Sequence, residues 1–209
     1  MGNKKIVSDA VIKRLPRYLR YLTELKRNDV LRVSSKELSE KMGLTASQIR
    51  QDLSCFGEFG QQGYGYNVEF LYDAINKILG TDKGFNIILI GAGNMGRAIS
   101  NSDSIRRRGF RIIGIFDIKK ELIGTKINDV EVLGFEELQP FIKNNKIDIA
   151  ALTVPREKTK EVAEKVVSYG VTGLWNFSAM ELKLPPNIIV ENVHLSDSIM
   201  VLGYKINNK

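Results

Sequence analysis

The sequence has very few of the residues from which disulfides and metal sites are built. Its 209 residues include one cysteine, Cys55, and one histidine, His194. A single cysteine excludes an intrachain disulfide and is too little for a zinc site made of cysteines. We therefore interpret Cys55 as a small buried hydrophobic residue and expect no metal site.

Long apolar segments are missing as well. No apolar run approaches the roughly 20 residues that a membrane-spanning helix needs. The polar start Met1–Asp9 lacks the apolar core of a signal peptide. The hydrophobic share of 43% is nevertheless ordinary for a globular chain. We expect a cytoplasmic protein of one large or two small domains, with no membrane partner.

Positive charge is concentrated near the N-terminus. The net charge is +7, and residues 1–67 hold twelve Lys and Arg against seven Asp and Glu. A basic balance permits nucleic-acid binding without proving it. Most of the excess charge nevertheless lies in the first third of the chain, which makes that third the candidate for such binding.

The first third has the pattern of a helix-turn-helix. Apolar residues recur at helical spacing over Ile6–Lys26. Ser34 and Glu37 then form a capping box for a short helix that Gly43 ends. Thr45 opens another helix with the same capping logic, and two short helices around a glycine-containing turn are typical of this motif.

A wing and a further helix complete the first predicted domain. Residues 57–67 are rich in glycine and aromatics, which suits a β-hairpin, and Asn67–Leu79 has helical periodicity. The polar, turn-forming residues 80–84 follow. We predict a winged-helix DNA-binding domain over residues 1–80.

A recognition helix presents its first residues to base edges in the major groove, while basic residues around it hold phosphates. Gln48 or Gln51 can hydrogen-bond adenine, and Arg50 can take guanine or a phosphate. For any one of these side chains the alternative is a solvated surface position. The predicted DNA contacts are Lys13, Arg14, Arg17, Lys36, Ala46, Ser47, Gln48, Arg50, Gln51, Gln61 and Tyr64.

The second part of the chain begins with a strand, a glycine-rich turn and a helix. Phe85–Ile90 is apolar enough for a strand buried on both faces, and Met95–Ile105 can form a helix. Between them, Gly91 permits a tight turn, Gly93 lets a pyrophosphate approach the backbone, and Gly96 lets the helix pack closely. This context predicts a dinucleotide site at Gly91, Ala92, Gly93, Asn94, Met95 and Gly96.

A carboxylate supports this prediction. The strand Phe110–Phe116 is followed by Asp117, which can accept hydrogen bonds from both ribose hydroxyls of an adenosine and would repel a 2′-phosphate. We therefore expect NADH/NAD+ rather than NADP as the cofactor. The alternative is an aspartate that only stabilises a strand–helix turn.

The remaining residues continue an alternation of strands and helices. Strands are predicted over 130–133, 147–154, 173–177 and 188–190, and helices over 135–143 and 158–169. The pattern predicts an α/β fold, with a Rossmann-like doubly wound parallel sheet over residues 81–191 that binds ligands beyond the strand carboxyl ends. The residues expected at those ends, which can equally be turn and core residues, are Thr153, Val154, Pro155, Asn176 and Phe177.

The last segment, 192–209, is a candidate helix that need not belong to the sheet layer. A helix appended in this way often packs on another domain or subunit. The alternative is a helix that covers the sheet of its own domain.

Taken together, these segments resemble the Rex family of bacterial redox-sensing transcriptional repressors. The resemblance spans nearly the whole chain, and its N-terminal motifs are quite specific. The matching segments are Ile12–Arg20, Val33–Leu38, Gln48–Ser54, Phe56–Gly60, Gly91–Ala98, Leu152–Glu157 and Trp175–Phe177.

The resemblance implies a homodimer whose C-terminal helices are exchanged between subunits. It also implies binding to palindromic, double-stranded operator DNA, release by NADH, and a response to the NADH/NAD+ ratio. In the family, an arginine matching Arg20 joins an aspartate and a tyrosine in a contact that reports NADH. This sequence has His194 and Ser102 at those two places, and Asp197 is a candidate substitute for the aspartate.

Two other functions remain as alternatives. An NAD-dependent oxidoreductase would need a hydride acceptor site and usually a positioned acid–base group, and His194 stands at no recognisable catalytic spacing from a carboxylate. A CoA-binding module would leave the helix-turn-helix without a purpose. We therefore expect a protein that is not an enzyme and has no catalytic residues.

Overall fold

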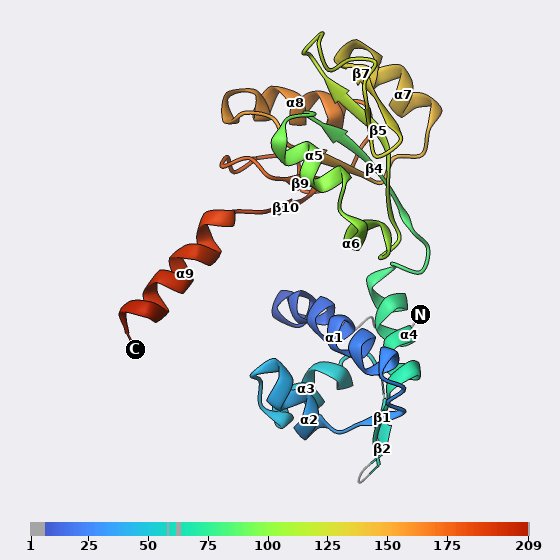
Figure 1. The fold of residues 1–209 in the computed structure, drawn as a ribbon, viewed down its shortest axis with the longest axis vertical. Coiled ribbons are helices and arrows are strands. Elements are labelled where there is room, and N and C mark those ends of the chain that lie inside the picture. The colour runs from blue at the N-terminus through green and yellow to red at the C-terminus, as the bar shows by residue number, and fades with distance from the viewer. Residues whose placement is uncertain (1–6, 58, 62–63, 209) are drawn as a thin grey trace. The chain divides into compact units, whose positions relative to one another are not determined.

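The computed structural model describes residues 7–57, 59–61 and 64–208. The chain divides into two compact units, Met1–Lys83 and Gly84–Lys209, whose elements are labelled in Figure 1. We describe each unit by itself.

The N-terminal unit is a winged helix. Its three strands form an antiparallel sheet in the order β1-β3-β2, and the β2–β3 hairpin is the predicted wing. The first helix begins at Asp9 rather than at Ile6. The elements are α1 (Asp9–Arg27), β1 (Arg32–Val33), α2 (Ser35–Met42), α3 (Ala46–Ser54), β2 (Gly60–Gln61), β3 (Gly65–Asn67) and α4 (Val68–Leu79).

The predicted helix caps of this unit are confirmed in their main contacts. The Ser34 hydroxyl accepts a hydrogen bond from the Glu37 N–H at 3.1 Å, and the Glu37 carboxylate accepts one from the Ser34 N–H at 2.7 Å. The Thr45 hydroxyl accepts a bond from the Gln48 N–H at 3.1 Å. These bonds satisfy N–H groups that have no partner inside the helix, and so they set where α2 and α3 begin.

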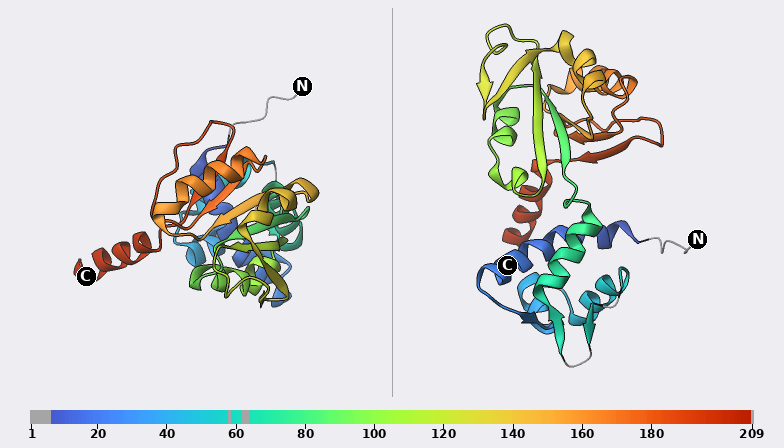
Figure 2. Two further views of the ribbon diagram at one scale, coloured as in Figure 1. Left: turned by 90° about the horizontal axis from the view of Figure 1, so that it is seen from above. Right: turned by 90° about the vertical axis from the view of Figure 1, so that its right-hand side faces the viewer.

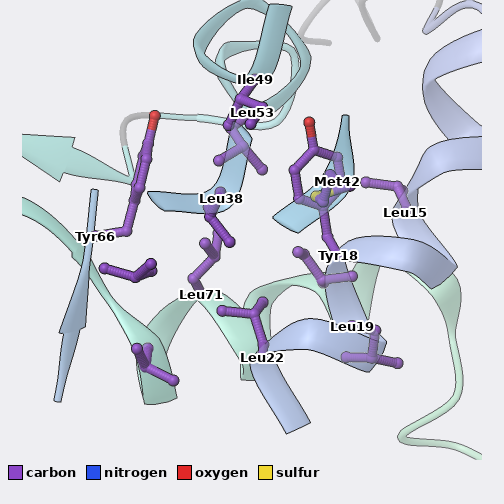
Figure 3. Close-up of a cluster of buried hydrophobic side chains, with 13 residues drawn as sticks. Leu15, Tyr18, Leu19, Leu22, Leu38, Met42, Ile49, Leu53, Tyr66 and Leu71 are labelled. Atoms are coloured by element: carbon purple, nitrogen blue, oxygen red, sulfur yellow. The ribbon is translucent and has the colours of Figure 1, made fainter. Parts of the chain in front are cut away.

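One apolar cluster holds the helices of the N-terminal unit together. Figure 3 shows this cluster, to which Tyr18 and Leu22 of α1, Ile49 and Leu53 of α3, and Leu71 of α4 belong. All of these side chains are almost fully buried. Burial of a large apolar side chain stabilises a fold by roughly 1.5–3 kcal/mol, so α1 and α4 form the platform on which the helix-turn-helix rests.

The C-terminal unit is the predicted doubly wound sheet. Its strand order is β10-β9-β8-β4-β5-β7-β6, with parallel pairing except between β6 and β7. The elements are β4 (Phe85–Ile90), α5 (Asn94–Ser100), α6 (Asp103–Arg106), β5 (Phe110–Asp117), β6 (Lys126–Ile127), β7 (Val130–Gly134), η1 (Phe135–Glu137), α7 (Leu138–Asn144), β8 (Ile149–Leu152), α8 (Arg156–Ser168), β9 (Gly173–Asn176), β10 (Ile189–Asn192) and α9 (Leu195–Asn207).

The central strand β4 is buried on both faces, as its sequence predicts. Ile88 and Ile90 pack with α7 and α8, whereas Ile87 and Leu89 pack on the opposite face with α5. The right-hand view of Figure 2 shows α5 on one side of the sheet and α7 and α8 on the other. Because side chains alternate along a strand, two helical layers cover one continuous apolar run.

Two predictions for this unit are wrong in detail. The single helix expected over Met95–Ile105 is two helices, because α5 ends at Ser100 and Ser102 is the N-cap of α6. Serine and aspartate favour such caps over helix interiors. In addition, the last helix begins at Leu195, and residue 192 belongs to strand β10.

Candidate functional site

The glycine-rich loop, Gly91–Gly96, lies where the strand order of the sheet reverses. The chain runs from β4 through β5 to β7, and then returns to β8 on the other side of β4. Gly91 follows β4, and its neighbour at the switch point is Thr153, which follows β8. Doubly wound sheets bind ligands in the crevice at this point.

The three glycines of the loop have different local reasons to be glycine. Gly91 has a φ of +104°, and a Cβ there would lie 2.7 Å from the Thr153 carbonyl oxygen. A Cβ on Gly96 would lie even closer to the Gly91 carbonyl oxygen. A Cβ on Gly93 would meet nothing within 4 Å, so the packing of the fold does not require glycine at residue 93.

Asp117, at the end of β5, binds backbone N–H groups on both sides. Its Oδ2 accepts a hydrogen bond from Ala92 at 2.6 Å, and its Oδ1 accepts bonds from Ile118 at 2.7 Å and Lys119 at 2.9 Å. The carboxylate therefore holds the glycine-rich loop against the next turn. A carboxylate has about four acceptor positions, so one remains for a ligand hydroxyl.

Asn94 and Met95 form the first turn of α5, and Asn94 is exposed. At the β8 end, the Thr153 hydroxyl donates toward the carbonyls of Ile90 and Gly91 at 3.0 and 2.7 Å. Pro155 is exposed at the start of α8. Val154 and Phe177 are partly buried and pack on the two apolar clusters, so their predicted cofactor contacts stay predictions.

Asn176 is held inside the fold by its side chain. Its side chain is fully buried, and its Nδ2 donates to the Met180 carbonyl and to the Asn192 side chain, both at 2.8 Å. Its Oδ1 accepts a bond from the Ser178 N–H at 3.0 Å. Both amide hydrogens are used inside the fold, and the predicted cofactor contact of Asn176 stays a prediction.

Sequence reasoning missed Ile118. This residue follows Asp117 at the carboxyl edge of the sheet, and 74% of it is exposed. An exposed isoleucine beside the expected ribose position offers an apolar surface to an adenine ring. The available signal was a large apolar residue directly after the strand-end aspartate.

The start of α3 faces solvent in the N-terminal unit. Ser47, Arg50 and Gln51 are exposed, whereas Ala46 and Gln48 are partly buried. Arg50 also donates a hydrogen bond to the Ser35 hydroxyl at 3.1 Å, which ties α3 to the start of α2. Of the three side chains predicted to read bases, Arg50 and Gln51 are exposed and Gln48 is partly buried.

The side-chain partner of Arg14 is a buried carboxylate. Its Nε and Nη2 donate to Oδ2 and Oδ1 of Asp52, both at 2.7 Å. Tyr18 donates to Oδ2 at 3.0 Å and Gln48 donates to Oδ1 at 2.9 Å. Arg14 therefore joins α1 to α3, and its predicted phosphate contact stays a prediction.

The pKa values follow from this network. Burial alone would raise the pKa of Asp52, but the hydrogen bonds from Arg14, Gln48 and Tyr18 together lower it below its usual value. The hydrogen bond to Asp52 raises the pKa of Arg14. Burial, followed by the bond to Asp52, raises the pKa of Tyr18. Asp52 is thus a buried anion at neutral pH.

Other predicted DNA contacts remain at the surface. Lys13, Arg17 and Lys36 are exposed, although Arg17 also donates to the Met42 carbonyl at 2.7 Å. On the wing, Tyr64 is 68% exposed, and Arg32, which sequence reasoning missed, donates to its carbonyl at 3.3 Å. The Gln61 side chain lies outside the described residues.

Comparisons with known proteins match both units. A family model described as "Putative DNA-binding protein N-terminus" covers residues 6–54, and one described as "CoA binding domain" covers residues 82–180. The chain is 57% identical to the redox-sensing transcriptional repressor Rex of Thermoanaerobacter sp. (strain X514), over all of this chain and 93% of that one. It is 55% identical to the Rex of Clostridium perfringens (strain 13 / Type A), over all of this chain and 98% of that one. The chain belongs to the Rex family.

Solved Rex structures share this fold. The crystal structure of RSP, a Rex-family repressor, in complex with β-NAD+ and operator DNA has a TM-score of 0.91 and 57% identity, covering 97% of this chain and 94% of that one. The structure of RSP with β-NADH also has a TM-score of 0.91, with 54% identity and coverage of 97% and 95%. The winged helix and the Rossmann-like sheet predicted from the sequence are therefore those of a Rex protein.

The residues predicted to form the Rex switch lie on both units. Arg20 is exposed on α1 of the N-terminal unit. In the C-terminal unit, His194 is the N-cap of α9 without a side-chain cap bond, and Asp197 lies exposed in the first turn of that helix. Ser102 shares a 2.9 Å hydrogen bond with Ser104. The contact between Arg20 and either α9 residue stays a prediction.

Helix α9 is apolar but buries none of its residues in this chain. The side chains of α9 that are more than half exposed are Leu195, Ile199, Met200, Val201, Leu202, Tyr204 and Ile206.

Within the described part of the chain, no helix is long and apolar enough to cross a bilayer, and no three His, Cys, Asp or Glu side chains gather as a metal site would require.

Proposed function

We propose that this chain binds palindromic operator DNA as a homodimer and is released by NADH, so that transcription follows the NADH/NAD+ ratio. The full-length relatives are named redox-sensing transcriptional repressors, and the matching RSP structures contain NADH, or NAD+ with operator DNA. In this proposal α3 reads the major groove, the wing contacts the DNA beside it, and the glycine-rich loop takes the pyrophosphate.

One observation in this structure carries the cofactor assignment. Gly93 has an ordinary negative φ of −69° and open space where its Cβ would be. Glycine costs conformational entropy and is disfavoured where the backbone does not need it. A close approach by a ligand explains the residue, and a pyrophosphate at the N-terminus of α5 is the ligand that fits this fold.

Gly93→Ala is expected to weaken NADH binding without weakening the fold. A methyl group forced into a packed contact costs about 1–3 kcal/mol, which corresponds to roughly 5–150-fold in affinity. Calorimetry would measure NADH affinity, thermal unfolding would measure stability, and gel shifts would measure operator binding with and without NADH. The variant should keep its operator affinity but need far more NADH for release. If Gly93→Ala binds NADH as tightly as the parent does, the proposal that the pyrophosphate lies against this loop is wrong.

Asp117→Asn is expected to narrow the preference for NADH over NADPH. The amide keeps an acceptor oxygen for the loop but loses the charge that repels a 2′-phosphate. Hydrogen bonds to charged groups contribute about 1.5–3 kcal/mol, so NADH affinity should fall roughly 10–150-fold, while NADPH affinity holds or rises. Titration of parent and variant with both nucleotides checks this. A parent that binds the two equally well would contradict the role of Asp117.

A second ligand belongs in the same titration, because the family model that covers residues 82–180 is described as a CoA binding domain. CoA shares an adenosine diphosphate with NADH and carries a 3′-phosphate in addition. We infer that NADH is the better ligand, since the one acceptor position that remains on Asp117 suits an unsubstituted ribose hydroxyl. Tighter binding of CoA than of NADH would support the CoA module instead.

We infer that the chain acts by binding rather than by turnover, and that it does so in the cytoplasm. The two relatives described above are named as repressors, and the single histidine is the N-cap of α9 and does not stand beside the glycine-rich loop in the sequence. Incubation with NADH and small carbonyl compounds tests this inference. Steady oxidation of NADH by the purified chain would favour the oxidoreductase.

A further inference from the structure

Asp52 is a buried carboxylate in the helix that is predicted to read DNA. Its exposed fraction is 0%, and it accepts four hydrogen bonds: two from Arg14, one from Tyr18 and one from Gln48. The first two residues belong to α1, whereas Gln48 lies one turn before Asp52 on α3. The bonds from Arg14 and Tyr18 are explained by a structural role, because they join α1 to α3. This role does not explain why the fourth donor is a residue at the start of the recognition helix.

We propose that Asp52 is a positioning residue that fixes the amide of Gln48 so that it reads one base of the operator. This inference rests on the proposed function, because it assumes that α3 enters the major groove. It adds that one base preference depends on a side chain that is fully buried and contacts no DNA itself.

The chemistry of the contact sets the direction of the amide. An ionised carboxylate can only accept hydrogen bonds, so the nitrogen of the Gln48 amide, and not its oxygen, faces Asp52 at 2.9 Å. One N–H and the carbonyl oxygen of the amide then stay free. That pair is the donor–acceptor edge with which glutamine binds adenine at N7 and N6.

The bonds from Arg14 and Tyr18 keep Asp52 ionised, and only the ionised carboxylate fixes the direction of the Gln48 amide. The bidentate bond from Arg14 and the bond from Tyr18 hold the pKa of Asp52 low in spite of burial. A neutral Asp52 carries a proton and can donate, which would allow the Gln48 amide to turn over. The same bonds join α3 to α1, so the amide is held by a rigid pair of helices.

The test compares base preferences rather than affinity alone. The parent would be used to select operators from a pool of randomised duplexes, and so would Gln48→Ala, Asp52→Asn, the double variant and the control Tyr18→Phe. We expect Gln48→Ala and Asp52→Asn to lose an adenine preference at the same operator position, by about 5–150-fold for one bidentate contact. The double variant should lose no more, and Tyr18→Phe should keep the preference, because it leaves the Gln48–Asp52 bond in place.

The Asp52→Asn substitution leaves one acceptor oxygen and adds an NH₂ group that can donate, so the side chain no longer fixes which end of the Gln48 amide faces it. A purely structural Asp52 would lower affinity equally for all sequences in Asp52→Asn and leave the preference unchanged, and that result would overturn the inference. A parent that selects no operator at all would instead overturn the proposed function.

A second measurement does not depend on whether a variant folds. In NMR spectra of the free parent, the side-chain NH₂ of Gln48 should be as rigid as the backbone of α3 and should be protected from exchange. A freely rotating amide in the parent would overturn the inference.

Discussion

Arg14→Met should destabilise the N-terminal unit more than any other single change on the surface of α1. Methionine keeps much of the apolar stem but removes both hydrogen bonds to Asp52, at 2.7 Å each. The carboxylate is then left buried without a counter-charge, since Asp52 is 0% exposed. Removal of one partner from a buried ion pair costs about 3–5 kcal/mol. Urea unfolding, followed through NMR signals of α1 and α3, measures this loss.

The dependence on pH gives the same prediction a second check. The folded-state pKa of Asp52 is lowered, so in the parent its contribution is present above the unfolded-state pKa of about 4. That contribution disappears as the pH falls through the lower folded-state pKa. In Arg14→Met, burial should raise the pKa of Asp52, so this variant gains relative stability as the pH falls. The gap between parent and variant should therefore be largest at neutral pH, narrow as the pH falls through the raised pKa of the variant toward about pH 4, and narrow further below about pH 4, where the parent loses its contribution.

Arg17→Met is the matched control. Arg17 lies on the same helix and donates one hydrogen bond, to the Met42 carbonyl, which contributes about 1 kcal/mol. Its loss should be small and nearly independent of pH. If the two variants lose equal stability, or if the gap for Arg14→Met does not change with pH, Asp52 is not the anion described here.

Local signals in the sequence predicted the features that depend on local chemistry. Ser34 with Glu37, and Thr45 before α3, predicted helix starts because a cap is formed by residues three apart. The apolar run Phe85–Ile90 predicted a central strand because only burial on both faces suits it. The glycine-rich loop was recognisable because its strand–turn–helix context is contiguous.

Long-range pairing is what the sequence did not reveal. Arg14 is basic, lies on a basic helix and was counted as a phosphate contact, yet its partner Asp52 is 38 residues away. Asn176 stands at a strand end, where a ligand contact is reasonable, but Asn192 on the next strand takes one of its hydrogens. A polar residue can serve a ligand or the fold, and its partner in three dimensions decides between them.

The short strand β6 shows a third limit. It has only two residues and pairs antiparallel with β7 through the turn at Asn128 and Asp129, whose φ values are +49° and +65°. Asparagine and aspartate tolerate positive φ, and two-residue hairpins need it at both positions. The turn signal was therefore present, but a strand of two residues has no periodicity to detect.

Ending the chain after Val193 should abolish both the dimer and tight operator binding. The truncation keeps β10, which ends at Asn192, and removes only α9. In this chain α9 buries none of its residues, and its large apolar side chains are more than half exposed. Exposed apolar surface of this extent marks an interaction site, and a second copy of the chain is the partner that the proposed function supplies. Light scattering should give the mass of one truncated chain, somewhat below the 23.5 kDa of the full chain, rather than the mass of two truncated chains.

Loss of the dimer should lower operator affinity far more than any single DNA contact would. A palindrome presents two half-sites to the two DNA-binding domains of a dimer. Linkage of two binding modules increases the overall affinity by about 10²–10⁴ through effective concentration. The truncated chain should lose affinity by that factor while NADH still binds, since the glycine-rich loop and Asp117 remain. Ile199→Glu should act in the same direction, because it charges the apolar surface of α9, whereas Ser198→Glu in the same helix serves as the control for charge alone. A truncated chain that still sediments as a dimer and binds the operator like the parent would place the dimer interface elsewhere, since the apolar surface of α9 would then have no part in it.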